Sequence, residues 1–235
     1  MMTKSEAISR LSLDFNKNCN LIEVLKHDSS SVLICGEDGC FVVKNCDGIY
    51  LFSVEDFSVA KPIIDGIDGL KVAMSTDLET ALYLKERFSI KSFKRCYQVL
   101  WNKKEKIPES HDLTIDKLEC TDYNIKAISS TYRGNLDFDE VASLMKRHGF
   151  LGAYVDGELA GYISWHSELT MGLLEVFKKY RRSGIGTALA MACVNQTLDL
   201  GRLPFHHVVD SNERSINLSK KMGFTFYDGF VYWVG

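Results

Sequence analysis

The sequence predicts an α/β fold with a mixed, mostly antiparallel sheet that is flanked by helices. Short apolar runs alternate along the chain with segments of helical spacing. Asp-Gly pairs at 156–157 and 228–229 separate neighbouring apolar runs, as tight turns between antiparallel strands do. The 235 residues are 46% hydrophobic and 25% charged, a composition that is typical of globular chains and excludes disordered and collagen-like ones.

The second half of the chain carries the clearer pattern, in the order β α α β β β α β α β β. We expect a strand at 113–118, helices at 125–132 and 137–147, a hairpin at 152–165, a strand at 169–176, a helix at 184–200, a strand at 204–209, a helix at 212–222 and two strands within 224–234. Gly223 follows the last of these helices and is suited to end it.

The first half repeats this order more weakly. We expect a hairpin at 31–44, a strand at 49–54, a helix at 59–67, a strand at 70–74, a helix at 78–88 and a strand at 90–100. This similarity predicts an internal structural duplication, and the alternative is an unrelated α+β domain.

A polar stretch at 102–112 separates the two halves and contains Pro108, one of only three prolines. Such a stretch is typical of a linker, so the sequence predicts two domains, 1–107 and 108–235. Each is within the size range of a small domain.

Charge and composition exclude several partners. The 28 basic and 31 acidic residues give a net charge of −3, so no overall positive field exists to hold nucleic acid or an anionic membrane. The opening residues 1–6 lack the apolar core of a secretory signal, and no apolar run approaches the roughly 18 residues of a spanning helix. We therefore expect a cytoplasmic protein. The sequence indicates no oligomeric state.

Cysteine and histidine spacing predicts no metal site. The seven cysteines form no C-x-x-C pair, which favours reduced, mostly buried side chains. His206 and His207 are adjacent in an expected strand, and neighbouring strand residues point to opposite faces. They cannot chelate one ion together.

The most informative stretch runs from Val176 to Thr187, where an expected strand leads into a long helix. Gly184 and Gly186 leave the backbone accessible, and the N–H groups that begin a helix attract anions with the help of its dipole. Basic side chains surround the same turn, at positions 178, 179, 181 and 182. The pattern predicts a local site for a diphosphate.

This stretch and a second one resemble the GNAT superfamily of acyl-CoA N-acyltransferases. The family pattern is V-x-P-x-x-R-x-x-G-x-G, followed by N-x-x-A-x-x-L-Y-x-x-x-G-F. The matching residues here are Val176, Arg181, Gly184, Gly186, Asn212, Leu218, Gly223 and Phe224. The resemblance implies the GNAT fold from about Leu113 to the C-terminus.

Within that superfamily, the second half is most similar to the glycine N-acyltransferase-like branch, through its Tyr180-Arg-Arg-x-Gly184 turn and its closing Gly223 to Trp233 segment. Those enzymes pair a degenerate N-terminal GNAT-like half with a catalytic C-terminal one. The first half lacks the glycine turn and has Val54-Glu-Asp-Phe-Ser-Val-Ala-Lys in its place. The resemblance therefore implies that only the second half binds coenzyme A.

The resemblance also assigns the co-substrate site, for acetyl-CoA or another acyl-CoA and without a metal. It implies that N–H groups of residues 182–187 hold the pyrophosphate and that 174–176 pair with the pantetheine amides. The residues assigned to this site are Leu174, Glu175, Val176, Arg181, Arg182, Ser183, Gly184, Ile185, Gly186, Thr187, Asn212 and Ser215.

The catalytic groups depart from the family pattern. The position of the basic glutamate in the glycine-type enzymes falls on Thr170, which cannot act as a base. Glu168 is the first candidate base, because strand alternation places it on the same face. Glu175 is the second, on the opposite face unless a β-bulge resets the alternation. His166 is the third.

The usual tyrosine that serves the leaving thiolate is also missing, because Ser219 occupies its place. Tyr227 and Tyr232 are the candidates to replace it. A coenzyme A thiolate with a pKa of about 8.5 can also leave with little acid help.

Two functions of different class follow. The first is an N-acyltransferase, with acetyl transfer expected, that acts on a small amine or amino acid, with a protein amino group as the alternative acceptor. The second is a catalytically silent acyl-CoA-binding or regulatory module. A plain α+β interaction domain is the remaining alternative.

Overall fold

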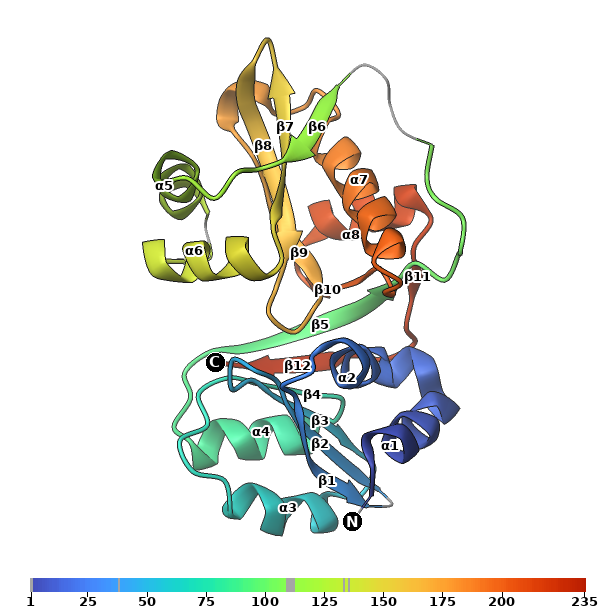
Figure 1. Cartoon of the computed structure of the whole chain (residues 1–235). Coiled ribbons are helices and arrows are strands. Elements are labelled where there is room, and N and C mark those ends of the chain that lie inside the picture. The colour runs from blue at the N-terminus through green and yellow to red at the C-terminus, as the bar shows by residue number, and fades with distance from the viewer. Residues whose placement is uncertain (1, 38, 109–112, 133, 135) are drawn as a thin grey trace. The chain divides into compact units, whose positions relative to one another are not determined.

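The computed structural model in Figure 1 describes residues 2–37, 39–108, 113–132, 134 and 136–235. The chain forms two compact units. Unit 1 comprises Met1–Leu100 and Phe205–Gly235, and unit 2 comprises Trp101–Pro204. The end of the predicted linker, residues 109–112, lies outside the described residues.

Unit 1 contains the whole first half of the chain and its last segment. Its elements are α1 (Lys4–Leu11), the 3-10 turn η1 (Ser12–Asp14), α2 (Phe15–His27), β1 (Val32–Glu37), β2 (Cys40–Lys44), β3 (Tyr50–Val54), α3 (Phe57–Asp65), β4 (Ala73–Ser75), α4 (Leu78–Arg87), β5 (Phe93–Leu100), β10 (Phe205–Val209), α8 (Glu213–Met222), β11 (Thr225–Phe226) and β12 (Val231–Val234).

These strands form one sheet in the order β1-β2-β3-β4-β12-β5-β10, and β11 also pairs with β5. The β3–β4 pair is parallel and the others are antiparallel. Helices α1 and α2 lie on one face of the strands β1–β4, and α3 and α4 lie on the other (Figure 1). The predicted mixed, mostly antiparallel sheet flanked by helices is confirmed.

The compact units differ from the two consecutive segments 1–107 and 108–235. Strand β5 of the first half pairs with β10 and β12 of the last segment, with Gln98 opposite His207 and Arg95 opposite Tyr232. At the other boundary, the side chain of Asn195 on α7 (Ile185–Asp199) bonds both the N–H and the C=O of Ile107 at 2.8 Å. Local patterns carry no signal for such distant pairing, so the division into two half-folds stays a prediction.

Helices α1 and α2 were not predicted from the sequence. Thr3 and Glu6 form a capping box that starts α1. Helix α2 buries the polar residues Asn18, Asn20 and Glu23 beside its apolar ones, which breaks the apolar stripe that marks an amphipathic helix. The Asn18 side chain finds buried partners in the Leu11 carbonyl and the Ser53 hydroxyl.

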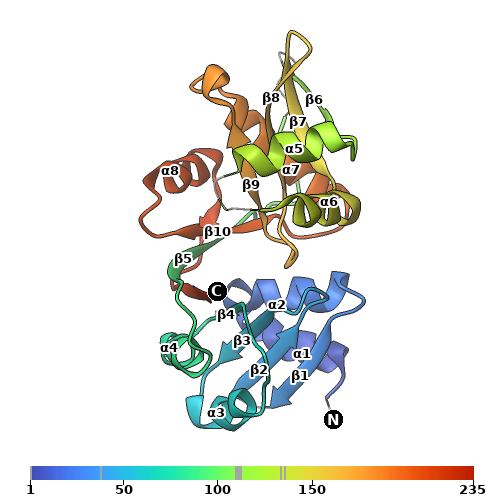
Figure 2. The ribbon, with the colours of Figure 1, turned by 90° about the vertical axis from the view of Figure 1, so that its left-hand side faces the viewer.

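Unit 2 holds a second sheet with the order β6-β7-β8-β9, antiparallel throughout. Its elements are β6 (Thr114–Lys117), α5 (Asp122–Thr131), α6 (Phe138–Arg147), β7 (Phe150–Val155), β8 (Glu158–Trp165), β9 (Met171–Val176), the 3-10 turn η2 (Lys178–Tyr180) and α7. Helices α5 and α6 cover one face of the sheet and α7 covers the other (Figure 2).

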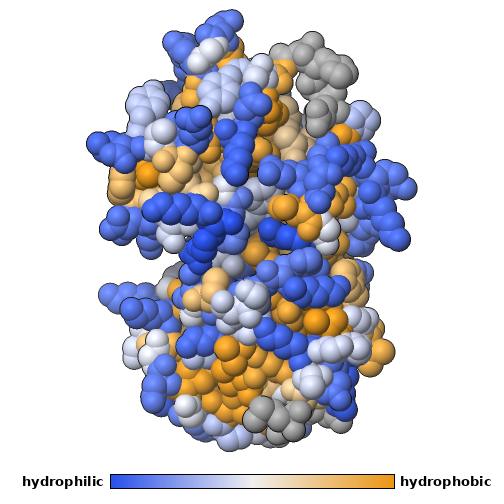
Figure 3. Space-filling view, in the orientation of Figure 1, coloured by the Kyte–Doolittle hydropathy of each residue, from blue (hydrophilic) through white to orange (hydrophobic). Residues whose placement is uncertain are grey.

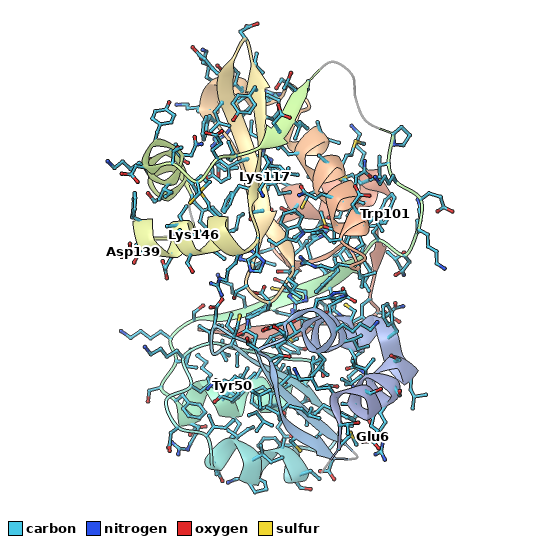
Figure 4. All side chains as sticks on the ribbon, in the orientation of Figure 1. Glu6, Tyr50, Trp101, Lys117, Asp139 and Lys146 are labelled. Atoms are coloured by element: carbon cyan, nitrogen blue, oxygen red, sulfur yellow. The ribbon has the colours of Figure 1, made fainter. Side chains whose placement is uncertain are left out.

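The α5–α6 face of this sheet is closed by an apolar cluster. Val141, Leu144 and Met145 of α6 pack with Phe150 and Tyr162 from the strands. On the opposite side of α6, the labelled Asp139 and Lys146 are exposed (Figure 4). The predicted helical spacing of 137–147 is therefore real, and the helix begins at Phe138 behind an Asp137 cap.

The surface carries apolar side chains as well as charged ones. Figure 3 shows apolar residues gathered on the visible face of unit 1. The edge strand β1 contributes the exposed side chains Val32 and Ile34. No described helix has the length and apolar character that crossing a membrane requires.

Gly161 allows β8 and β9 to pair closely. A Cβ atom at this position would lie 2.6 Å from the Glu175 carbonyl oxygen and 3.1 Å from the Val176 Cα. Both contacts are backbone atoms, so Gly161→Ala should lower the free energy of unfolding by about 1–3 kcal/mol, as overpacking does. Gly66→Ala is the control, because its Cβ would meet only ordinary contacts at 3.6 and 3.7 Å. Urea unfolding measures both variants, and equal stability would contradict this assignment.

Candidate functional site

Strand β9 is an edge strand of the unit 2 sheet. It pairs with β8 on one side, and no described strand pairs with its other side. An extended ligand can hydrogen-bond such a backbone edge in the way an added strand does. The predicted pantetheine segment, Leu174 to Val176, lies on this edge.

A β-bulge interrupts β9. Gly172 lies opposite Ser164 and Glu175 lies opposite Tyr162, so two residues of β9 face the single residue between Ser164 and Tyr162 on β8. Leu173, within the bulge, has φ +53. Residues directly opposite each other share a face, so the bulge places Glu175 on the same face as Gly172. Such a bulge is what the sequence prediction required for Glu175 to lie on the same face as the other candidate bases.

The chain then turns into α7 through two left-handed residues, Arg182 at φ +70 and Gly184 at φ +84. Gly184 is the N-cap of α7, and no described side chain caps that helix start. The first N–H groups of a helix have no intrahelical acceptor. A Cβ built at Gly184 would meet no atom within 4 Å. The helix start therefore has both the donors and the room that an anion needs.

The helix start of the first half that the sequence predicts to correspond to this one is closed. Asp56 is the N-cap of α3, and its carboxylate accepts hydrogen bonds from the Ser58 N–H at 2.9 Å and the Ser58 hydroxyl at 2.6 Å. These bonds lower the pKa of Asp56. A carboxylate already satisfies this helix N-terminus, and β3 is paired on both edges. The start of α3 therefore offers no open position to an anion, and β3 offers no unpaired edge to an extended ligand.

The four basic residues of the turn are not equivalent. Arg181 donates from Nε to the Val176 carbonyl at 2.9 Å and from Nη2 to the Glu175 carboxylate at 2.8 Å, so it fastens the turn to the end of β9. Lys179 pairs with Glu158 at 2.8 Å. The charges predicted at 179 and 181 are thus already paired.

Lys178 and Arg182 are exposed, and within the described ranges they have no carboxylate partner. The N–H of Thr187 donates to the Gly184 carbonyl at 2.9 Å, which leaves it out of the predicted pyrophosphate contacts. The N–H groups of 183–186 are among the predicted donors that stay available.

Two of the candidate bases, His166 and Glu168, lie in the β8–β9 turn, and Glu175 lies near the end of β9. Glu168 is 6% exposed, and its Oε1 accepts a hydrogen bond from the Thr170 hydroxyl at 2.6 Å. The Glu168 carboxylate thus contacts Thr170, the residue on which the resemblance places the base. The imidazole of His166 lies against Gly172, on the face that Glu175 shares. The structure brings all three candidates to the α5–α6 face of the sheet.

Tyr132 is a residue of this face that sequence analysis did not identify. It caps the C-terminus of α5, with its N–H bonded to the Ile128 carbonyl. Burial raises the pKa of its phenol, and the carboxylates of Glu168 and Glu175 raise it further.

The remaining predicted residues belong to unit 1. Asn212 is the N-cap of α8 and accepts a hydrogen bond from the Ser215 N–H at 3.2 Å. Tyr232 packs on Phe93, and Tyr227 packs on Gly229. Coenzyme contacts by Asn212 and Ser215 stay predictions.

His206 and His207 serve different networks. The Trp233 indole N–H donates to Nδ1 of His207 at 3.0 Å, so Nε2 carries the proton and donates to Gln98 at 2.9 Å. The Ser219 hydroxyl donates to the Ser215 carbonyl at 2.9 Å, so it accepts from Nε2 of His206 at 2.8 Å. The two rings share no ligand, and the described residues contain no group of three or more ligands that could hold a metal.

Comparison with known proteins finds one family match, in the second half of the chain. Residues 111–224 match the acetyltransferase (GNAT) family. A search of the curated proteins found no match.

Solved structures match along most of the chain. The X-ray structure of a Drosophila protein matches with a TM-score of 0.70 at 17% identity, over 99% of this chain and 96% of the other. A GCN5-related N-acetyltransferase from Sphaerobacter thermophilus matches with a TM-score of 0.57 at 13% identity, over 100% and 93%. A GCN5-related N-acetyltransferase-like protein from Streptococcus suis matches with a TM-score of 0.56 at 11% identity, over 99% of both chains.

The family match and the shared fold support a GNAT acetyltransferase domain in the second half of the chain. The predicted GNAT fold class is confirmed.

A carboxylate at position 184 should abolish coenzyme A binding. Acetyl-CoA at about 100 times its Kd should stabilise the wild-type protein by about 2.7 kcal/mol, a shift of several degrees in thermal unfolding. In Gly184→Glu the new charge repels the diphosphate, so this shift should vanish. Gly201→Glu is the matched control, because Gly201 also has a positive φ, +68, and nothing within 4 Å of its Cβ. A shift retained in Gly184→Glu, or lost in both variants, would contradict the assignment.

Burial of His206 should make stability depend on pH. Desolvation lowers its pKa from 6.5 to about 4. Between these values the unfolded chain binds a proton that the folded protein excludes, so the free energy of unfolding should fall by up to about 3 kcal/mol as the pH drops from about 6.5 to about 4. His206→Gln cannot titrate and should lose less stability over this range. Urea unfolding at about pH 7 and about pH 4.5 measures the difference, and identical losses would refute it.

Proposed function

We propose that this protein is an acyl-CoA-dependent N-acyltransferase that moves an acetyl or other acyl group from coenzyme A directly to an amine of a small molecule or amino acid. The GNAT family match supports an acyltransferase. The observation that carries the proposal is the open start of α7 directly after the unpaired, bulged edge of β9.

The coenzyme site we propose has two parts in unit 2. The N–H groups of 183–186 bind the diphosphate, with added positive charge from Lys178 and Arg182. The edge of β9 at 174–176 pairs with the pantetheine amides, and one of its N–H groups polarises the thioester carbonyl. The space at Gly184 and the lack of a capping side chain support this fit.

Glu168 is the general base in this proposal. The acceptor amine must lose a proton before or as it attacks, and a carboxylate within reach can accept it. Thr170 orients the Glu168 carboxylate by its hydrogen bond, whereas Arg181 already binds the carboxylate of Glu175. We therefore propose that Glu175 contributes to the shape and charge of the site. His166 stays the third candidate for the base.

The proposal extends to the domain organisation. We infer a degenerate GNAT-like half in 1–107 and a catalytic half in 108–235, as in the glycine N-acyltransferase-like branch. The capped start of α3 and the two-sided pairing of β3 support the loss of the coenzyme site from the first half.

We also infer a cytoplasmic location. No disulfide joins the described cysteines, and Cys46 and Cys120 are exposed. Exposed thiols outside disulfides are typical of a reducing compartment.

Replacing the proposed base tests the enzyme against a silent acyl-CoA-binding module. Glu168→Gln should lower kcat about 100-fold or more, because general base catalysis contributes about 10²- to 10⁴-fold. Its acetyl-CoA affinity should stay unchanged. Glu175→Gln should have the smaller effect on kcat. Steady-state thiol release and the thermal shift with acetyl-CoA measure the two properties separately.

The outcomes separate the hypotheses. Coenzyme binding without turnover on any amine, including peptide N-termini, would favour the silent module. Transfer to peptide amines alone would favour a protein N-acetyltransferase. Turnover that survives in both glutamate variants would show that neither residue is the base.

A further inference from the structure

Unit 1 contains a surface hollow that the proposed coenzyme site does not use. The hollow has a volume of about 350 Å³ and lies at the end of the sheet where the parallel strands β3 and β4 begin. One wall is the β2–β3 turn at 44–50, and the other is the loop at 68–72 that leads into β4. Its size is within the range of sites for small molecules, about 300–1,000 Å³.

The two walls are held in place by hydrogen bonds of the chain itself. The Asn45 side chain is buried, and its Oδ1 accepts from the N–H of Asp47 at 3.0 Å and from the N–H of Ile49 at 2.9 Å. The Tyr50 N–H donates to the Val72 carbonyl at 3.2 Å, which joins one wall to the other. A ligand that enters this hollow therefore does not have to order the loops around it.

Charged side chains of both signs line the hollow. Two ammonium groups come from Lys44 and Lys71, and the Lys44 ammonium lies over the Tyr50 ring, 5.2 Å from its centre (Figure 4). Two carboxylates come from Asp47 and Asp68. In the part of the chain that the structure describes, Lys44, Lys71 and Asp68 form no ion pair. Three of the four charges are therefore available to a ligand.

The surface between these charges is partly apolar. Ile49 and Val72 line the hollow and are half-buried, so part of each side chain stays exposed. Gly69 belongs to the same lining, and a Cβ built there would meet no atom within 4 Å. The hollow thus has both an apolar surface and the room for a small apolar group.

The balance of charge distinguishes between classes of ligand. A simple anion that binds the two lysines would lie beside two carboxylates, and a simple cation that binds the carboxylates would lie beside two ammonium groups. Either arrangement brings like charges together, which is unfavourable. A small zwitterion can pair each of its charges with one of opposite sign, and hydrogen bonds between ionised groups are the stronger ones.

We propose that this hollow binds a free amino acid with an apolar side chain. The carboxylate of the amino acid pairs with Lys44 and Lys71, and its ammonium group pairs with Asp68. Its side chain packs on Ile49 and Val72. The hollow shares no residue with the proposed coenzyme site, so amino-acid binding here does not depend on acyl transfer.

Calorimetric titration of the whole chain tests the class of ligand. L-Leucine should bind with a Kd of about 1 mM or below. Isocaproate lacks the ammonium group and isoamylamine lacks the carboxylate, while both keep the apolar part of leucine. Each should bind about 10- to 100-fold more weakly, the loss expected when a hydrogen bond between charged groups is missing. Equal binding of either compound, or no binding of leucine, would overturn the proposal.

Removing one charge at a time tests the location. Asp68→Asn and Lys71→Met should each weaken leucine binding about 10- to 100-fold. Both side chains are exposed, so thermal unfolding without ligand should stay unchanged. Glu79→Gln and Lys26→Met are the matched controls, because both are exposed side chains of unit 1 outside the hollow. The controls should bind leucine as the wild type does.

The remaining outcomes separate this site from the coenzyme site. Wild-type affinity for leucine in both Asp68→Asn and Lys71→Met would place the amino acid elsewhere on the chain and overturn the site. Gly184→Glu should bind leucine with wild-type affinity, and loss of binding in this variant would also overturn the site. If the wild-type protein binds leucine but not acetyl-CoA, the proposed function fails and the amino-acid site stands.

Discussion

The start of helix α7 is the constraint on which the rest of the site depends. No described side chain caps its first N–H groups because the N-cap is Gly184, in a left-handed conformation that glycine adopts without strain. Helix α3 of the first half begins instead on Asp56, whose own carboxylate accepts a hydrogen bond from the Ser58 N–H. The N-cap residue thus distinguishes the two helices. Gly184 leaves a position at the start of α7 that attracts an anion, and Asp56 makes the start of α3 repel one.

The β-bulge in β9 connects this anion site to the chemistry. Without the extra residue, strand alternation would turn Glu175 to the α7 face. With it, Glu175 lies on the α5–α6 face with Gly172 and within electrostatic reach of Tyr132. Arg181 then joins the Glu175 carboxylate and the Val176 carbonyl to the turn, so that strand edge, helix start and acidic face are built as one piece of unit 2.

Sequence reasoning found what is encoded locally. The glycine turn, the α7 helix and the Asp156-Gly157 hairpin depend on neighbouring residues, and the structure has all three. The bulge at Leu173 depends on pairing with β8, and the inclusion of β5 between β12 and β10 depends on residues more than 100 positions apart. Tyr132 has no motif and was missed, because only folding brings Glu168 and Glu175 to it.

Backbone amide hydrogen exchange with and without saturating acetyl-CoA tests the central claim most directly, because the claim concerns which N–H groups the coenzyme takes up. The account predicts slower exchange at 183–186 and on the β9 edge at 174–176, with the capped start of α3 unchanged. Unchanged exchange in both segments of unit 2, while the protein demonstrably binds the coenzyme, would contradict it.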